Sequence, residues 1–163
     1  MRGLQMEWEV IATIAEVVGA VAVIVTLLYL STQIRQTNKA IRSSSFHEIT
    51  NSWNEINGWM ATDESLARIL RIGLAKPEDL TEDEFARMSF VLLAAFHVME
   101  TIYFQREAGT VDSRLWEAEK RSMKTFLNSP GGRMWWKENP YSFTTDYRIF
   151  VDKEIIGIEN GPE

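Results

Sequence analysis

Hydrophobic residues dominate the amino-terminal part of the chain. Between Val10 and Ile34 the only charged residue is Glu16, and no proline interrupts the run. This pattern predicts a helix that is apolar on every side, and about 20 helical residues span the roughly 30 Å hydrocarbon core of a bilayer. We therefore expect one transmembrane helix over residues 10–34, after an extracytoplasmic amino terminus over residues 1–9. A buried helix of a soluble bundle and a cleaved signal peptide are the alternatives, and the acidic leading segment disfavours the second.

Basic residues follow the apolar run and acidic residues precede it. They are Arg35, Lys39 and Arg42 after the run, and Glu7 and Glu9 before it. Basic flanks favour the cytoplasmic side of a membrane. The sequence therefore predicts an amino terminus outside the cell and a cytoplasmic carboxy-terminal domain.

Small residues form a stripe along the predicted transmembrane helix. Their spacings of 3, 4, 3 and 4 place them on one face: Ala12, Ala15, Gly19, Ala22 and Thr26. Small side chains let helix backbones approach closely in lipid, where no hydrophobic force drives association. We therefore expect a helix–helix interface here, although alanine and glycine are common in all membrane helices.

Glu16 is the one ionisable residue inside the predicted span. Such a group is costly in lipid unless it faces water, a partner or a cavity. In a ring of subunits, Glu16 and with it Thr26 would lie near a pore that attracts cations. The simpler interpretation places Glu16 close to the outer interface, where it is hydrated or protonated.

Helical periodicity continues beyond the membrane segment. Nothing between Arg35 and Phe46 breaks a helix, so the transmembrane helix is expected to continue as a stalk. Apolar residues then recur at spacings of 3, 4, 3 and 4, on the side expected to pack against later helices: Phe46, Ile49, Trp53, Ile56 and Met60. The stalk is thus expected to become part of a bundle.

Helix-start signals divide the residues that follow. Thr62 or Asp63 is expected to cap a short helix that ends at Leu74, and Thr81 with Glu84 forms a capping box for a longer one. This longer helix is expected from residue 82 to about 107, with one apolar face made of Phe85, Met88, Leu92, Phe96, Met99 and Tyr103.

The long helix raises the question of a second membrane crossing. Its apolar run, Phe90–Phe104, has only about 15 residues and carries His97 and Glu100 in its middle. The centre of a soluble bundle suits such a helix better, and we therefore predict a single crossing.

Later capping signals complete the bundle. Asp112 or Ser113 is expected to start a helix that ends near Leu127, a turn and a short helical piece follow over residues 129–140, and Thr144 is expected to cap a last helix. No strand pattern or internal repeat is present. The predicted class is all-α, with a stalk and cytoplasmic bundle of about five helices over residues 35–156 and a tail over residues 157–163.

Composition removes several classes of function. Among 163 residues there are 17 lysines and arginines against 23 aspartates and glutamates, a net charge of -6, so we expect no nucleic-acid partner. The absence of cysteine excludes disulfides, thiolate metal sites and cysteine nucleophiles. No nucleotide-binding glycine motif or nucleophile elbow occurs. We therefore expect no cofactor and no evident catalytic activity.

Histidine and carboxylate residues offer one weak candidate for a metal site. His97 lies one turn before Glu100, and further ligands on the stalk would be His47, Glu48 and Glu55. Helical-bundle metal sites normally carry Glu-x-x-His on two helices, whereas here the order is reversed and occurs once. We therefore expect no metal, and expect Glu100 to be a buried partner of Arg68 or Arg71.

Two further features have a structural and a functional interpretation. Gly131 and Gly132, beside Arg133, precede a possible helix start where an anion could bind, although turn geometry explains them as well. Trp135 and Trp136 are expected to fill the core or to contact a membrane surface.

Three segments together resemble a known family. They are AEVVGAVAVIVTLLYLSTQIRQTNKAIRSSSF over residues 15–46, HVMETIYFQREAG over residues 97–109, and SPGGRMWW over residues 129–136. They are similar to a family of small uncharacterised bacterial membrane proteins with one amino-terminal transmembrane helix and a helical cytoplasmic domain. The resemblance covers most of the chain and implies a bacterial inner membrane, and it implies no activity or catalytic residue.

These observations lead to three hypotheses of function. In the first, a single-pass membrane-anchored helical protein self-assembles into a homo-oligomer or docks an unidentified protein partner. In the second, the oligomer is an ion channel or transport component with Glu16 near the pore. In the third, the bundle is a metal-binding enzyme that uses His97 and Glu100.

Overall fold

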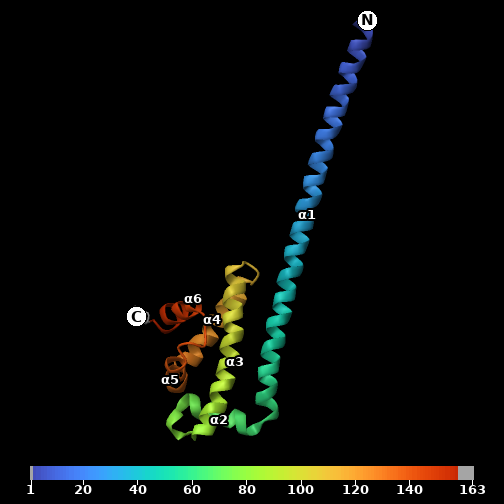
Figure 1. Cartoon of the computed structure of the whole chain (residues 1–163). Helices are drawn as coiled ribbons and strands as arrows, with labels where there is room; N and C mark the ends of the chain where they lie inside the picture. Colours follow the sequence, from blue (N-terminus) through green and yellow to red (C-terminus); the bar gives the residue numbers. More distant parts are fainter. Residues whose placement is uncertain (1, 158–163) are drawn as a thin grey trace. The chain divides into compact units, whose positions relative to one another are not determined.

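A computed structural model describes the backbone of residues 2–157, and the side chains of residues 2–7, 9, 10 and 13 lie outside the described part. This part is helical and contains no strand. Its elements are α1 (Arg2–Thr62), α2 (Glu64–Ala75), the 3-10 turn η1 (Pro77–Asp79), α3 (Glu82–Glu107), α4 (Ser113–Leu127), α5 (Pro130–Glu138), α6 (Thr145–Phe150) and the π-helical segment η2 (Val151–Ile156). The predicted all-α class with a long apolar amino-terminal helix is confirmed (Figure 1). Of the predicted tail, only Gly157 lies within the described residues.

The chain divides into two units, residues 1–41 and residues 42–163. The first consists of the amino-terminal part of α1. The second contains residues 42–62 of α1 and all later elements, and we call its described part the bundle.

α1 is a helix of 61 residues. It contains no proline, and four of its threonine hydroxyls donate to backbone carbonyl oxygens one turn earlier in the helix. Thr26 donates to the carbonyl oxygen of Ala22 at 2.8 Å, and Thr32 donates to that of Leu28 at 2.9 Å. These bonds leave no hydroxyl hydrogen unpaired, so the two side chains suit an apolar environment.

α3 supplies the central face of the bundle. Four of its predicted face residues are fully buried, and Phe85 and Tyr103 are half-buried against the same core. The buried four are Met88, Leu92, Phe96 and Met99. By length and hydropathy α1 and α3 could each cross a membrane. The buried face of α3 favours its interpretation as a core helix.

The last part of α1 packs on α3. Ile56 is buried in a cluster with Val91 and Ala95 of α3, with Trp53 and Met60 at its margin, and Ile49 belongs to the main core. The fifth member of the predicted apolar stripe, Phe46, is 53% exposed. Its expected packing is therefore wrong, because the core ends one turn later, at Ile49.

Capping residues begin the helices where the sequence predicts them. Asp63 accepts from the backbone N–H of Leu66 at 3.1 Å, and Asp112 accepts from that of Arg114 at 2.9 Å. Thr81 and Glu84 form the predicted capping box. α3 ends before Gly109, whose φ of 73° is a left-handed conformation that glycine adopts without strain.

Aromatic side chains fill the interior beside α3. Trp135 and Trp136 are buried, and both contact Phe96 and Phe143 through their rings. Each indole N–H has a partner, since Trp135 donates to Ser89 Oγ at 2.7 Å and Trp136 donates to Asp152 Oδ1 at 2.8 Å. The expectation that this pair fills the core is confirmed.

The interpretation of Gly131 and Gly132 as turn residues is wrong. Both lie inside the first turn of α5, and a Cβ at Gly131 would overlap the carbonyl oxygen of Gly73 in α2. The guanidinium of Arg133 bonds within the bundle, since its Nε donates to the carbonyl oxygen of Leu127 at 3.1 Å. The glycines therefore allow two helix backbones to touch.

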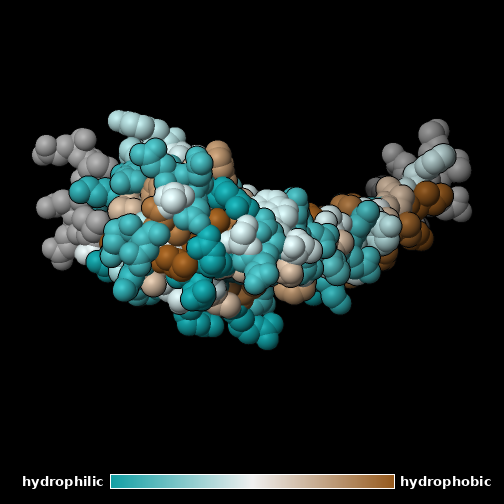
Figure 2. Space-filling model, turned by 90° about the horizontal axis from the view of Figure 1, so that it is seen from below, coloured by the Kyte–Doolittle hydropathy of each residue, from teal (hydrophilic) through white to brown (hydrophobic). Residues whose placement is uncertain are grey.

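The bundle surface is mostly hydrophilic on the face seen in Figure 2, with small hydrophobic patches between polar side chains. Phe90 and Tyr141 are among its most exposed aromatic residues, at 72% and 98%. Scattered apolar residues of this kind are normal for a surface in water.

Candidate functional site

The amino-terminal unit exposes an apolar surface along its length. Every described large hydrophobic residue from Ile11 to Leu30 is at least 45% exposed. Water is a poor environment for such a surface, and burial of apolar area yields about 25 cal/mol per Å². This segment therefore needs an apolar environment that residues 1–41 do not themselves provide.

The predicted small-residue stripe lies open on this helix. Its members Ala12, Ala15, Gly19, Ala22 and Thr26 are all exposed. A Cβ built at Gly19 would meet nothing within 4 Å. The stripe is thus an uncovered surface of α1 in a single chain.

Glu16 lies beside this stripe. It follows Ala12 by four residues and precedes Gly19 by three, spacings that place all three on the same half of a helix. Glu16 is exposed, and it forms no ion pair within the described part of the chain. A partner helix on the stripe would therefore lie close to this carboxyl group.

His97 and Glu100 do lie close together, and Glu100 joins α3 to the start of α6. His97 Nδ1 is 3.3 Å from Glu100 Oε2. Glu100 Oε1 accepts from the backbone N–H and the hydroxyl of Thr144, at 2.8 and 2.7 Å. Thr144 is the predicted cap of α6, but its own side chain makes no capping hydrogen bond. Glu100 thus satisfies the first free backbone N–H of that helix from outside.

The expected pairing of Glu100 with Arg68 or Arg71 is wrong. Arg68 pairs with Glu84 instead, across α2 and α3. The guanidinium of Arg68, through its hydrogen bond, holds the pKa of the Glu84 carboxyl below its usual value. Both partners lie near the solvent, so the pair adds little stability.

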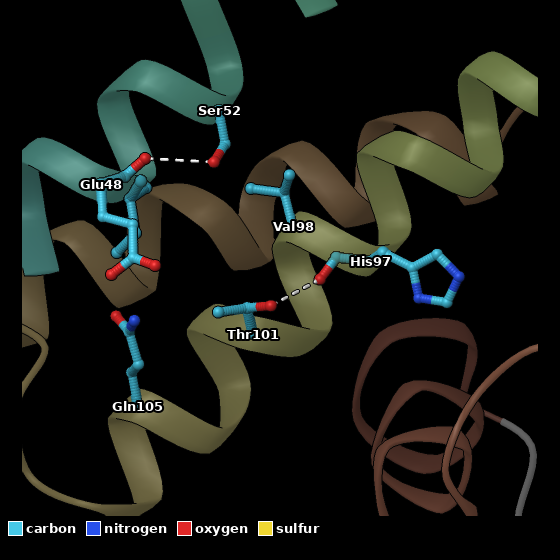
Figure 3. A pocket seen from close by; sticks show the side chains of 7 residues that line it. Glu48, Ser52, His97, Val98, Thr101 and Gln105 are labelled. Carbon is cyan, nitrogen blue, oxygen red and sulfur yellow. Dashed lines mark hydrogen bonds between the residues drawn. The ribbon is translucent and has the colours of Figure 1, made fainter. Parts of the chain in front are cut away.

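Residues that could hold a metal are not gathered. No group of three or more histidine, aspartate or glutamate side chains lies close enough to bind one ion in the described part of the chain. Glu48 and His97 contribute to the same pocket, but the imidazole of His97 points away from Glu48 (Figure 3).

A pocket lies between α1 and α3, and we call it the α1–α3 pocket. It has a volume of about 200 Å³. Its lining comes from two helices and consists of Glu48, Ile49, Ser52, His97, Val98, Thr101 and Gln105 (Figure 3). In the figure the carboxylate of Glu48 and the amide of Gln105 point toward one another.

Sequence reasoning did not single out Ser52, Thr101 or Gln105. A signal for them exists, because polar residues recur every fourth position on both helices. Glu48 and Ser52 repeat on α1, and on α3 the repeat runs through His97, Thr101 and Gln105. Such spacing places polar groups on one helix face, and two such faces meet at the pocket.

A buried carboxyl group also lies inside the bundle. Glu119 of α4 is 8% exposed, and burial raises the pKa of its carboxyl, an effect that the neighbouring indole N–H of Trp53 partly offsets. Trp53 Nε1 is itself buried and has no hydrogen-bond partner of normal geometry. The two groups form an incompletely satisfied polar contact between α1 and α4.

The chain matches no protein-family profile, no curated protein and no solved structure.

Proposed function

We propose that the protein is a single-pass membrane protein whose residues 10–34 cross the bilayer and whose residues 35–156 form a cytoplasmic helical stalk and bundle. The observation that supports this most directly is the continuous exposure of the apolar side chains from Ile11 to Leu30. A lipid bilayer is the environment that removes such a helix from water at every side.

The proposed orientation puts the amino terminus outside. Arg35, Lys39 and Arg42 follow the apolar segment, and basic flanks are retained on the cytoplasmic side. The acidic residues before it, Glu7 and Glu9, have side chains outside the described part. In a bacterium the corresponding membrane is the inner membrane.

The proposed role of the membrane helix is assembly. The small-residue stripe would let a second helix approach closely, and Glu16 beside it would gain a polar environment at the same interface. The partner would be a further copy of the chain or an unidentified protein. A ring of subunits would place Glu16 close to a pore.

Two introduced cysteines test the topology, because the chain contains none of its own. Gln5→Cys should react with a membrane-impermeant maleimide in intact cells. Tyr141→Cys, at a position that is 98% exposed, should react only after permeabilisation. Release of the protein by alkaline carbonate would contradict the membrane anchor, and the reverse labelling pattern would contradict the orientation.

The mass of the particle in nanodiscs tests assembly. An oligomer should dissociate in the variant Gly19→Leu, which fills the stripe, and should survive in Val21→Leu on the opposite face of the helix. A ring of four or more subunits would call for conductance measurements on Glu16→Gln. A monomer would exclude the pore, because one helix cannot enclose water, and would direct the search to another membrane protein.

A further inference from the structure

The two hydroxyls of the α1–α3 pocket offer acceptors rather than donors. Ser52 Oγ donates to the carbonyl oxygen of Glu48 at 3.1 Å, and Thr101 Oγ1 donates to that of His97 at 3.0 Å (Figure 3). A hydroxyl has a single hydrogen, so these two oxygens have only lone pairs left for another molecule.

Two further side chains of the pocket carry acceptor oxygens that receive no hydrogen bond from the described residues. The carboxylate of Glu48 is exposed and forms no ion pair among the described residues. Gln105 Oε1 is buried and accepts no hydrogen bond. A buried acceptor without a donor is costly, and such atoms are rare in folded proteins. A donor brought to the Glu48 and Gln105 end of the pocket would serve both.

The remaining lining fixes the size and character of the molecule that fits. Ile49 and Val98 provide apolar walls, and no lysine or arginine is among the seven lining residues. The volume of about 200 Å³ exceeds that of an engineered protein cavity of about 150 Å³ that binds benzene. The imidazole of His97 points away from Glu48, and its Nδ1 lies 3.3 Å from Glu100, so it does not compete for the same space.

We infer that the α1–α3 pocket binds a small organic cation with a primary ammonium group and a short alkyl chain. The three N–H donors of the ammonium match the acceptors of Glu48, Thr101 and Gln105, and the charge is opposite to that of Glu48. The alkyl chain lies against Ile49 and Val98. The carboxylate of Glu48 would repel an anion, so an anionic ligand is disfavoured. The residues that carry the inference all lie in the bundle, and none of them lies in the proposed membrane segment.

Methyl NMR on the full chain tests this inference. The protein is labelled at isoleucine and valine methyl groups and held in nanodiscs of phosphatidylcholine and phosphatidylglycerol, which contain no primary amine. Butylammonium should cause saturable shifts at Ile49 and Val98. The uncharged analogue 1-butanol should bind at least about tenfold more weakly, and butyrate should cause no saturable shift. Equal binding of 1-butanol and butylammonium, or no saturable shift with either, would overturn the inference.

A pair of variants separates the pocket charge from general charge effects. Glu48→Gln keeps the size of the side chain and should weaken butylammonium binding about tenfold. Glu55→Gln removes a carboxylate that is exposed on the same helix and does not line the pocket, and it should leave binding unchanged. Circular dichroism checks that both variants fold. Unchanged affinity in Glu48→Gln would contradict the inference.

The ammonium group could belong to a free amine or to a lipid headgroup. Replacing the phosphatidylcholine of the nanodisc by phosphatidylethanolamine distinguishes them. Shifts at Ile49 and Val98 without added amine would identify the lipid, and shifts that appear only on adding butylammonium would identify the free amine.

Discussion

The indole N–H of Trp136 donates a hydrogen bond of 2.8 Å to Oδ1 of Asp152, and both residues are buried. The bond connects α5 to the π-helical segment η2. The guanidinium of Arg148 lies over the same indole, with Cζ 4.6 Å from the ring centroid, and donates to the carbonyl oxygen of Trp136 at 3.1 Å. Three side chains thereby hold the carboxy-terminal part of the bundle onto the aromatic core.

Removal of the Asp152 carboxylate should destabilise the bundle. Asp152→Ala leaves the Trp136 N–H buried without an acceptor, which costs about 1–3 kcal/mol. Asp152→Asn keeps an acceptor oxygen and should cost less. Urea unfolding followed by near-ultraviolet circular dichroism, which reports the tryptophan environment, measures both. Equal stability of Asp152→Ala and the unchanged protein would contradict the assigned role.

Loss of Glu100 should free the start of α6. Glu100→Ala removes the acceptor of two Thr144 hydrogen bonds, and loss of such a cap costs about 1 kcal/mol. Hydrogen exchange at the amides of residues 144–148 should become faster, while that of α3 changes little. The control is Glu117→Ala, which removes one partner of an exposed pair with Lys120 and should change stability by less than about 0.5 kcal/mol. If both variants show the same exchange, the capping role of Glu100 is wrong.

Glu119 should make stability depend on pH with a sign opposite to that of most carboxylates. Because burial raises its pKa above the ordinary value of 4.5, the folded chain keeps this proton to higher pH than the unfolded chain does. The stabilising contribution is complete below the ordinary value and is lost as pH rises through the raised value, at about 1.4 kcal/mol per unit of pKa difference.

The variant Glu119→Gln isolates this effect. It should be more stable than the unchanged protein at pH 7, and the difference should disappear below about pH 4, where both side chains are neutral. Urea unfolding across this pH range measures the difference. Glu117→Gln, which removes an exposed carboxylate two residues away, is the matched control variant. A difference between Glu119→Gln and the unchanged protein that does not vary with pH would contradict the assignment.

The helices and their starts could be predicted because they depend on local signals. Thr81 with Glu84 fixes the start of α3 through bonds within four residues, and Gly109 marks its end. The apolar face of α3 follows from a spacing that any helix converts into one side. For the same reason the core positions of Met88 and Phe96 were predictable.

Contacts between distant residues could not be predicted in this way. Glu100 bonds to Thr144, 44 positions away, and nothing in the local sequence distinguishes this partner from Arg68. Glu119 is buried although its helix is polar in composition. Its burial depends on how α4 meets Trp53, which the sequence of α4 alone does not show. The α1–α3 pocket was missed because each of its helices carries only part of the polar lining. Periodicity describes one helix face, whereas a site needs two.

Gly131 should be the glycine that tolerates substitution least. It lies where α5 touches the backbone of α2, and a methyl group there would overlap the carbonyl oxygen of Gly73. Backbone atoms cannot rotate away as a side chain can, so Gly131→Ala must separate the two helices. We expect a loss of about 3 kcal/mol or more in the free energy of unfolding, which thermal unfolding and the yield of folded protein would both reveal.

Gly58 provides the matched control for this substitution. It lies in the interior of α1, and a Cβ there would meet nothing within 4 Å. Alanine favours a helix over glycine by about 0.5–1 kcal/mol, so Gly58→Ala should raise stability by that amount. The same chemical change should therefore have opposite signs at the two positions. If Gly131→Ala were as stable as Gly58→Ala, α5 and α2 could not be in backbone contact. Gly131 and Gly132 would then be explained by turn geometry, as the sequence suggested.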